Sequence, residues 1–184
     1  MTEAEIIKSG GVGVMPTDTL YGLVASAFLP IAVERVYSLR ERNKDKPCII
    51  LISSFKDLKK FSVTINDDTK NILEKYWPGK VSVVLPCPDE KFQYLHRGTK
   101  SLAFRMPDDK KLQEFISETG PLIAPSANVQ GNQSAESIEQ ARGYFGSNVD
   151  FYMDAGKLSG LPSTLIRIEN GIISVLRDGT VKIK

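Results

Sequence analysis

Hydroxyl and carboxylate side chains cluster directly after the first apolar run of this sequence, where they could bind a polar substrate. The segment 16–23 reads PTDTLYGL and places Thr17, Asp18 and Thr19 at the end of a predicted strand. Ligand-binding groups in α/β folds gather at strand ends. An ordinary turn, in which threonine and aspartate cap local amides, accounts for the same residues about equally well.

A basic cluster spans residues 40–47, with the sequence RERNKDKP. Guanidinium and ammonium groups such as those of Arg40, Arg42 and Lys46 bind phosphate through charge-assisted hydrogen bonds. The same run also fits a solvated helix end, where cations complement the helix dipole. Its two acidic residues weaken a purely electrostatic argument, so both interpretations stay open.

Further polar groups follow later apolar runs. Ser126 and Asn128 lie in the segment 124–128, APSAN, where they could hold a ribose, a base edge or a phosphate, or simply form a turn. Arg167 and Arg177 suit an anionic ligand or surface carboxylates equally. Arg105 lies within an apolar run and needs an anionic partner if its side chain faces inward.

Several common catalytic arrangements are missing from the sequence. There is no G-x-x-x-x-G-K-[ST] loop and no G-x-G-x-x-G fingerprint. The single histidine, His96, is expected in a surface loop, so a Ser-His-Asp or Cys-His set is not formed. Cys48 and Cys87 are isolated, which fits neither a zinc site nor a disulfide framework and favours a reducing compartment. The remaining groups suit alignment of anionic substrates better than covalent catalysis.

Composition excludes several classes of protein. The 184 residues are 41% hydrophobic and 25% charged, as in an ordinary globular domain. The formal net charge of +2 is too small to select nucleic acid as a partner without a local cluster. Residues 1–10 lack the pattern of a signal peptide, and no apolar stretch reaches membrane-spanning length. We expect a soluble, cytoplasmic protein with no membrane partner.

Helix and strand patterns alternate along the chain, which predicts an α/β fold. Helices are expected at 2–9, 31–40, 66–76, 108–118 and 137–144. Strands are expected at 12–15, 21–27, 48–52, 81–85, 102–106, 122–124, 149–153, 164–168 and 172–176. No linker or repeat divides the sequence, so residues 1–184 are expected to form a single domain with a twisted, mixed, open sheet flanked by helices.

Taken together, the clusters resemble the YrdC/Sua5 family of threonylcarbamoyl-AMP synthases. The matching segments follow in order over nearly the whole chain: PTDTLYGL at 16–23, R-x-R-x-x-x-K-P at 40–47, WPG at 77–79, LAFRM at 102–106, PSAN at 125–128 and ST at 163–164. The resemblance implies a YrdC-like α/β domain with a concave basic surface. The length matches the short branch of the family, without the additional C-terminal domain of the longer branch.

The resemblance also implies a reaction and a set of roles. L-threonine, bicarbonate or CO2, and ATP would give threonylcarbamoyl-AMP and pyrophosphate, for the N6-threonylcarbamoyladenosine modification of tRNA. Arg40, Arg42 and Lys46 would be catalytic through charge neutralisation. The implied threonine-binding residues are Thr17, Arg105 and Thr164, and the implied ATP-binding residues are Arg42, Lys46, Ser126, Asn128 and Arg177. No protein-bound metal is implied, and Mg2+ would arrive with ATP.

Two departures and two alternatives accompany this resemblance. Arg40 occupies the place of a family lysine, and Leu51 stands where the longer branch has histidine. Threonylcarbamoyl-transferase proteins are the implied downstream partners, and tRNA or double-stranded RNA is a possible ligand. The alternatives are a double-stranded RNA-binding or ribosome-maturation factor and a YciO-like paralogue with another acceptor.

Overall fold

The computed structural model describes residues 1–183, and within them nine strands form a single sheet. The strand order is β7-β1-β2-β6-β3-β5-β4-β8-β9. The strands are β1 (Val12–Pro16), β2 (Tyr21–Ser26), β3 (Ile49–Leu51), β4 (Val81–Pro86), β5 (Ser101–Arg105), β6 (Leu122–Ile123), β7 (Phe151–Tyr152), β8 (Thr164–Glu169) and β9 (Ile172–Arg177). The helices are α1 (Glu3–Lys8), α2 (Pro30–Leu39), α3 (Lys56–Lys60), α4 (Asp67–Tyr76), η1 (Glu90–Phe92), α5 (Gln93–His96), α6 (Lys110–Thr119) and α7 (Ile138–Phe145).

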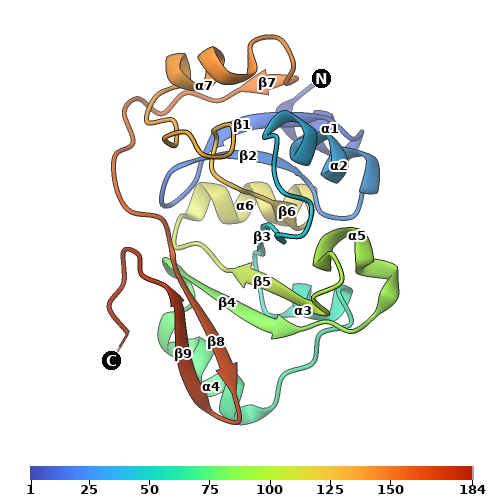
Figure 1. Ribbon diagram of the computed structural model, residues 1–184, viewed down its shortest axis with the longest axis vertical. Coiled ribbons are helices and arrows are strands. Elements are labelled where there is room, and N and C mark those ends of the chain that lie inside the picture. The colour runs from blue at the N-terminus through green and yellow to red at the C-terminus, as the bar shows by residue number, and fades with distance from the viewer. Residues whose placement is uncertain (184) are drawn as a thin grey trace.

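The sheet is mixed, as the sequence predicts. β3 pairs with β5 in parallel, and β4 pairs with β8 in parallel, whereas β1 and β2 are antiparallel. The closing β8–β9 hairpin is antiparallel and turns at Asn170 and Gly171, both of which have positive φ. Figure 1 shows this hairpin at one end of the molecule and α7 with β7 at the other. The prediction of an α/β fold is therefore confirmed.

Local sequence explains where the helices begin. Thr2 and Glu5 form a capping box at the start of α1, since each side chain accepts a hydrogen bond from the other's backbone amide. Asn66, Asp109 and Ser137 accept hydrogen bonds in the same way at the starts of α4, α6 and α7. These caps satisfy amides that have no partner within the helix, which is why the boundaries agree with the sequence pattern.

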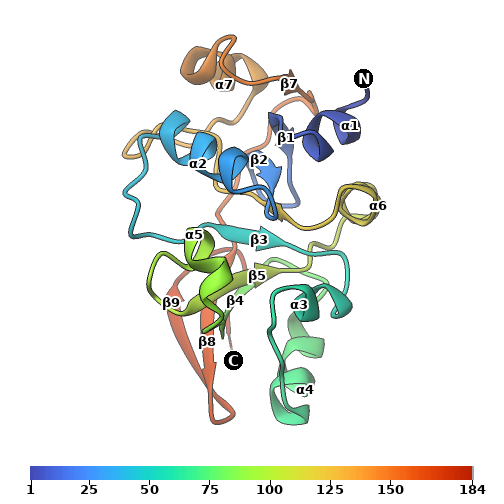
Figure 2. The ribbon, with the colours of Figure 1, turned by 90° about the vertical axis from the view of Figure 1, so that its right-hand side faces the viewer.

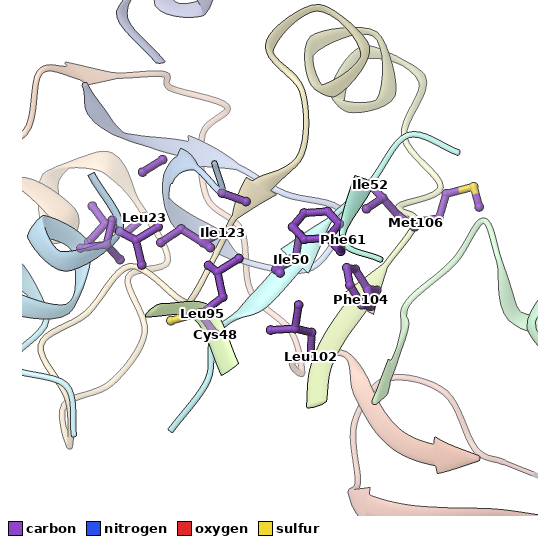
Figure 3. Close-up of a cluster of buried hydrophobic side chains, with 14 of the residues drawn as sticks. Leu23, Cys48, Ile50, Ile52, Phe61, Leu95, Leu102, Phe104, Met106 and Ile123 are labelled. Atoms are coloured by element: carbon purple, nitrogen blue, oxygen red, sulfur yellow. The ribbon is translucent and has the colours of Figure 1, made fainter. Parts of the chain in front are cut away.

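Apolar side chains pack on both faces of the sheet. The larger core lies between the sheet and helices that include α2, α5 and α7. Figure 3 shows part of it, with Ile50 of β3 and Ile52, which follows that strand, near Phe104 of β5. The smaller core lies under α1 and α6 and includes Leu51 and Leu122. Figure 2 shows α2 and α5 on one side of the sheet and α1 and α6 on the other. Leu51 is thus a core residue.

The expectation for His96 was wrong. Its side chain is fully buried at the end of α5, where Nδ1 accepts a hydrogen bond from the amide of Gly98. α5 has four residues and α3 has five. Neither helix is long enough to produce a periodic apolar pattern, so neither was predicted. Across residues 1–183 no helix has the length and apolar character needed to cross a membrane.

Candidate active site

The strand ends and the connections that follow them surround a cavity of about 370 Å³. It is bounded by the β1–β2 turn, the segment after α2, the strands β3 and β5, the segment after β6, and the ends of β8 and β9. Residues singled out from the sequence lie on its lining: Thr17, Arg40, Arg42, Arg105, Ser126 and Arg177. Chain segments more than 150 positions apart in the sequence therefore meet at one site. Lys46, Asn128 and Thr164, which the sequence also singled out, are not among the lining residues.

The β1–β2 turn is held together by the hydroxyl of Thr17. Thr17 Oγ1 donates to the carbonyl of Leu20 at 2.7 Å and accepts from the amides of Thr19 and Leu20 at 3.3 Å each. The hydroxyl proton of Thr17 is thus donated within the turn. The hydroxyl of Thr19 also lies on the lining, 3.1 Å from Thr17 Oγ1. A Cβ at Gly22 would lie 3.0 Å from Thr17 Cγ2, so glycine lets the turn fold close to β2.

Arg105 has the anionic partner that its apolar surroundings require. Its Nη2 lies 3.0 Å from Oδ1 of Asp18, and the two side chains are 5% and 3% exposed. Burial lowers the pKa of the Arg105 guanidinium, and the negative charge of Asp18 opposes that shift. Burial likewise raises the pKa of Asp18, against the attraction of Arg105 and Lys80. The expectation of a buried ion pair at Arg105 is confirmed.

Asn128 holds Arg40 and Ser126 from behind the lining. Arg40 Nε donates to the carbonyl of Asn128, and Nη2 donates to Asn128 Oδ1, each at 3.0 Å. Ser126 Oγ donates to the same Oδ1 at 2.7 Å. The Asn128 amide nitrogen donates to the carbonyls of Val129 and Asn132, so every polar atom of this buried side chain is committed. Its contribution to the cavity is therefore indirect.

Burial and a neighbouring cation also affect Arg40. Its side chain is almost fully buried, and this burial, with a smaller repulsion from Arg42, lowers its pKa to about 10. A guanidinium with that pKa still carries its charge at neutral pH. Arg40 stands where the resemblance implies a lysine. The arginine keeps a positive charge at this position, but its charged group is planar and is fixed by hydrogen bonds.

Arg42 is oriented by the loop that follows it. Its Nε donates to the carbonyl of Lys46 at 3.0 Å, and Nη2 donates to the carbonyl of Pro47 at 2.9 Å. Lys46 contributes its backbone to this arrangement, and its exposed side chain is not on the lining. The sequence pointed to the charged side chain of Lys46. In the structure the backbone carbonyl of Lys46 makes the contact with the lining residue Arg42.

Arg177 reaches the cavity from the end of β9. Its Nη2 donates to the carbonyl of Ser163 at 2.7 Å and to Ser163 Oγ at 3.2 Å. Ser163 Oγ also lies 2.8 Å from Ser82 Oγ in a buried pair. Thr164 turns the other way, because its hydroxyl donates to the carbonyl of Val181 and accepts from the Val181 amide. Ser163, and not Thr164, lies on the cavity lining.

Two lining residues with hydroxyl groups, Ser134 and Ser163, received no role from the sequence, and Thr19 was named there only as a member of the 16–23 cluster. Thr19 and Ser163 lie inside segments that the sequence did single out, whereas Ser134 has no such context. Within residues 1–183 the lining carries guanidinium and hydroxyl groups but no carboxylate or imidazole. The described residues also contain no group of three or more histidine, cysteine, aspartate or glutamate side chains placed to hold a metal ion. Such a cavity suits a substrate with several negative charges.

Comparisons with known proteins show the family and the fold of the chain. The model of the Sua5/YciO/YrdC family, described as telomere recombination, matches residues 5–179. A putative threonylcarbamoyl-AMP synthase of Mycobacterium leprae is 32% identical over 178 residues, covering 96% of this chain and 81% of the relative. The structure of Pyrococcus abyssi Sua5 complexed with L-threonine has a TM-score of 0.88 at 31% identity, covering 96% of this chain and 52% of that one. E. coli YciO has a TM-score of 0.87 at 22% identity, covering 98% and 89%, which shows a common fold.

Proposed function

Because the chain belongs to the Sua5/YciO/YrdC family, we propose that it is a threonylcarbamoyl-AMP synthase that uses L-threonine, bicarbonate or CO2, and ATP. The observation that carries this proposal is the convergence of Arg40, Arg42, Arg105 and Arg177 on one cavity together with several hydroxyls. An amino-acid carboxylate and a triphosphate are the anions that such a set of guanidinium groups can bind together.

The reaction has two bond-forming steps. The threonine ammonium group first loses a proton to solvent. The amine nitrogen then attacks the carbon of bicarbonate with loss of water, or the carbon of CO2 with loss of a second proton to solvent, and a carbamate forms. A carbamate oxygen then attacks the α-phosphorus of ATP, and the bond from that phosphorus to the bridging oxygen breaks. Pyrophosphate leaves with the electron pair of that bond. No covalent bond to the protein is required, which fits a lining without a cysteine–histidine or serine–histidine pair.

Threonine would bind at the end of the cavity formed by the β1–β2 turn and β5. The Arg105 guanidinium is suited to its carboxylate, and the Thr19 hydroxyl is better placed than that of Thr17 to interact with its polar groups. Thr17 would act by shaping the turn. Thr164 would act through the position of its neighbour Ser163.

ATP would occupy the end formed by Arg40, Arg42, Ser126 and Arg177. These cations would neutralise the triphosphate and the charge that develops as pyrophosphate leaves, and their fixed positions reduce reorganisation during the reaction. Asn128 would support this end through Arg40 and Ser126. Lys46 would contribute by orienting Arg42. Mg2+ would arrive bound to the ATP phosphates as part of the substrate.

The product fits a cytoplasmic role in tRNA modification. A mixed anhydride such as threonylcarbamoyl-AMP is an activated acyl donor, so a transferase must consume it. We place this step before transfer to adenosine in tRNA, with threonylcarbamoyl-transferase proteins as the partners. Direct binding of tRNA or double-stranded RNA to this chain is not needed for the reaction.

Amino-acid-dependent release of pyrophosphate from ATP tests the proposal. The purified protein is incubated with ATP, bicarbonate and each of the twenty amino acids in turn. We expect release with L-threonine well above release with the other amino acids. Arg42→Gln should lower the rate about 100-fold, because a fixed cation next to the phosphates is lost. Arg35→Gln is the matched control, since Arg35 pairs with Asp150 outside the cavity lining and its loss should leave the rate unchanged.

Preference for another amino acid would reassign the chain to a YciO-like role with a different acceptor. Pyrophosphate release that does not depend on any amino acid would contradict the proposed synthase. An RNA-binding factor that uses the same cations would bind RNA with affinity that falls steeply with salt and would release no pyrophosphate.

A further inference from the structure

Asp18 is a buried carboxylate that lies behind the cavity, where the proposed reaction gives it no role. Thr17 and Thr19, its neighbours in the chain, line the cavity, but Asp18 does not. Both of its carboxylate oxygens are inaccessible to solvent. Within residues 1–183 neither has a well-aligned hydrogen-bond donor, although the backbone amides of Asp108 and Asp18 lie close enough to lower the pKa of Asp18. Its close contact is instead the ion pair with Arg105, in which Oδ1 lies 3.0 Å from Nη2. Burying a charge this deeply costs free energy unless a partner of opposite charge compensates for the lost hydration.

Arg105, the partner of Asp18 in this ion pair, lies on the cavity lining. The side chain lies on β5, whose neighbours β3 and β4 fix the backbone on both sides. In the described part of the chain, Arg105 Nε has no hydrogen-bond partner, and Nη2 lies next to Asp18. Arg177 is close enough to lower the pKa of Arg105 by repulsion, after the larger effect of burial. The contact with Asp18 therefore opposes the repulsion of Arg105 by another cavity arginine.

We propose that Asp18 is a positioning residue for threonine: its carboxylate holds the Arg105 guanidinium at the orientation in which that group binds the amino-acid carboxylate. This inference rests on the proposed function. Asp18 acts from behind the guanidinium while the substrate binds on the side that faces the cavity. The burial of both oxygens excludes direct proton abstraction from the threonine ammonium group by Asp18 in this conformation.

A positioning role and simple structural support predict different changes in the Michaelis constants. A misdirected Arg105 impairs binding of the amino acid but leaves the ATP end intact, because Arg40, Arg42 and Arg177 are held by other contacts. Misplacing a binding group by about 1 Å weakens its function by up to about 100-fold. General loosening of the fold would instead lower the amount of active protein and leave both Michaelis constants unchanged.

Asp18→Asn tests the inference, because it removes the charge and keeps the shape of the side chain. The KM for threonine and the KM for ATP are measured by pyrophosphate release with the 184-residue chain. We expect the KM for threonine to rise about 10-fold to 100-fold, with the KM for ATP changed by less than about twofold. Asp18→Glu keeps the charge but moves it, and its KM for threonine should fall between those of the wild type and Asp18→Asn.

Asp150→Asn is the matched control, because Asp150 also pairs with an arginine, Arg35 at 2.6 Å, but away from the cavity lining. Its KM for threonine should equal that of the wild type. If Asp18→Asn does not fold, Asp18→Glu carries the test alone. If the wild type is active and the folded Asp18 variants have the same KM for threonine as the wild type, the proposed role of Asp18 is overturned. An inactive wild type instead overturns the proposed synthase itself, so the two failures are distinguishable.

Discussion

At the scale of single residues, the polar groups of the cavity hold one another in place without a substrate. Arg40, Arg42 and Arg177 each donate to backbone carbonyls, and Arg105 pairs with Asp18. Fixed donors stabilise developing charge better than mobile ones, since they need not reorganise during the reaction. We therefore expect the groups behind the lining, which include the backbone carbonyls and Asn128, to affect activity as well as the cations on the lining.

Asn128→Ala tests this role of the groups behind the lining. The change removes the acceptor shared by Arg40 Nη2 and Ser126 Oγ. We expect the KM for ATP to rise about tenfold and the KM for threonine to change little, as measured by pyrophosphate release. The matched control is Asn132→Ala, because the Asn132 side chain is exposed and only its backbone carbonyl contacts Asn128. Equal effects of the two substitutions would contradict a supporting role for Asn128.

The sequence predicted most of the charged residues of the cavity but not how they are held. An arginine in an apolar run requires an anion, so the pairing of Arg105 could be anticipated from elementary energetics. Lys46 and Thr164 were assigned by resemblance; in the structure the Lys46 carbonyl accepts a hydrogen bond from Arg42, and the Thr164 hydroxyl donates to the carbonyl of Val181. Backbone contacts of this kind depend on the path of the chain and leave no mark in the local residue pattern.

At the scale of elements, the cavity is made by connections whose ends are fixed to the sheet. The segment between β7 and β8 leads to Ser163 and is anchored by Tyr21 of β2. The Tyr21 hydroxyl donates to the carbonyl of Gly156 at 2.7 Å and accepts from the amide of Ala155 at 2.9 Å. One side chain in a buried strand thus determines where a distant part of the cavity wall begins.

Tyr21→Phe should release this segment. Losing the hydroxyl leaves the Ala155 amide and the Gly156 carbonyl without their partner, so we expect the free energy of unfolding to fall by about 1–3 kcal/mol. Amide exchange at residues 154–157 should become faster, because local opening then costs less. Tyr152→Phe is the control, since the Tyr152 hydroxyl donates to Gly146 at the end of α7 and should not affect exchange in that segment. Unchanged exchange in Tyr21→Phe would contradict the anchoring role.

The elements predicted from sequence are those that local chemistry specifies. Capped amphipathic helices and apolar strands were predicted to within a few residues, because caps and periodicity are local properties. The short helices α3 and α5 were not, and with α5 the burial of His96 was missed. Four or five residues do not complete enough turns to show a period, so only tertiary packing determines their conformation.

At the scale of the whole molecule, one twisted sheet has helices on both faces (Figures 1 and 2). The sheet separates two apolar cores and supports the cavity at its strand ends. The fold class and the mixed pairing could be predicted from the alternation of elements. The strand order could not, because the positions of β6 between β2 and β3 and of β4 between β5 and β8 depend on long-range packing. The arginines of the cavity come together only through that order, although the net charge of the chain is +2.

The larger core should set global stability. Phe104 is fully buried on β5, with its ring centroid 5.2 Å from that of Phe61. We expect Phe104→Ala to lower the free energy of unfolding by about 3–5 kcal/mol, because it leaves a cavity in a packed interior. Ile172→Ala on the exposed edge strand β9, where the side chain is 68% exposed, should change it by less than about 0.5 kcal/mol. Chemical denaturation measures the free energy of unfolding of both variants. Similar losses of stability in the two variants would contradict the placement of Phe104 in the core that sets global stability.

In the proposed reaction, one cavity joins an amino acid, a one-carbon unit and a nucleotide. The most direct measurement is mass spectrometry of the nucleotide products after incubation with ATP, L-threonine and isotope-labelled bicarbonate. We predict threonylcarbamoyl-AMP that carries the label, formed in equal amount with pyrophosphate and only when threonine is present. Pyrophosphate without a labelled adenylate, or an adenylate containing a different amino acid, would contradict the account.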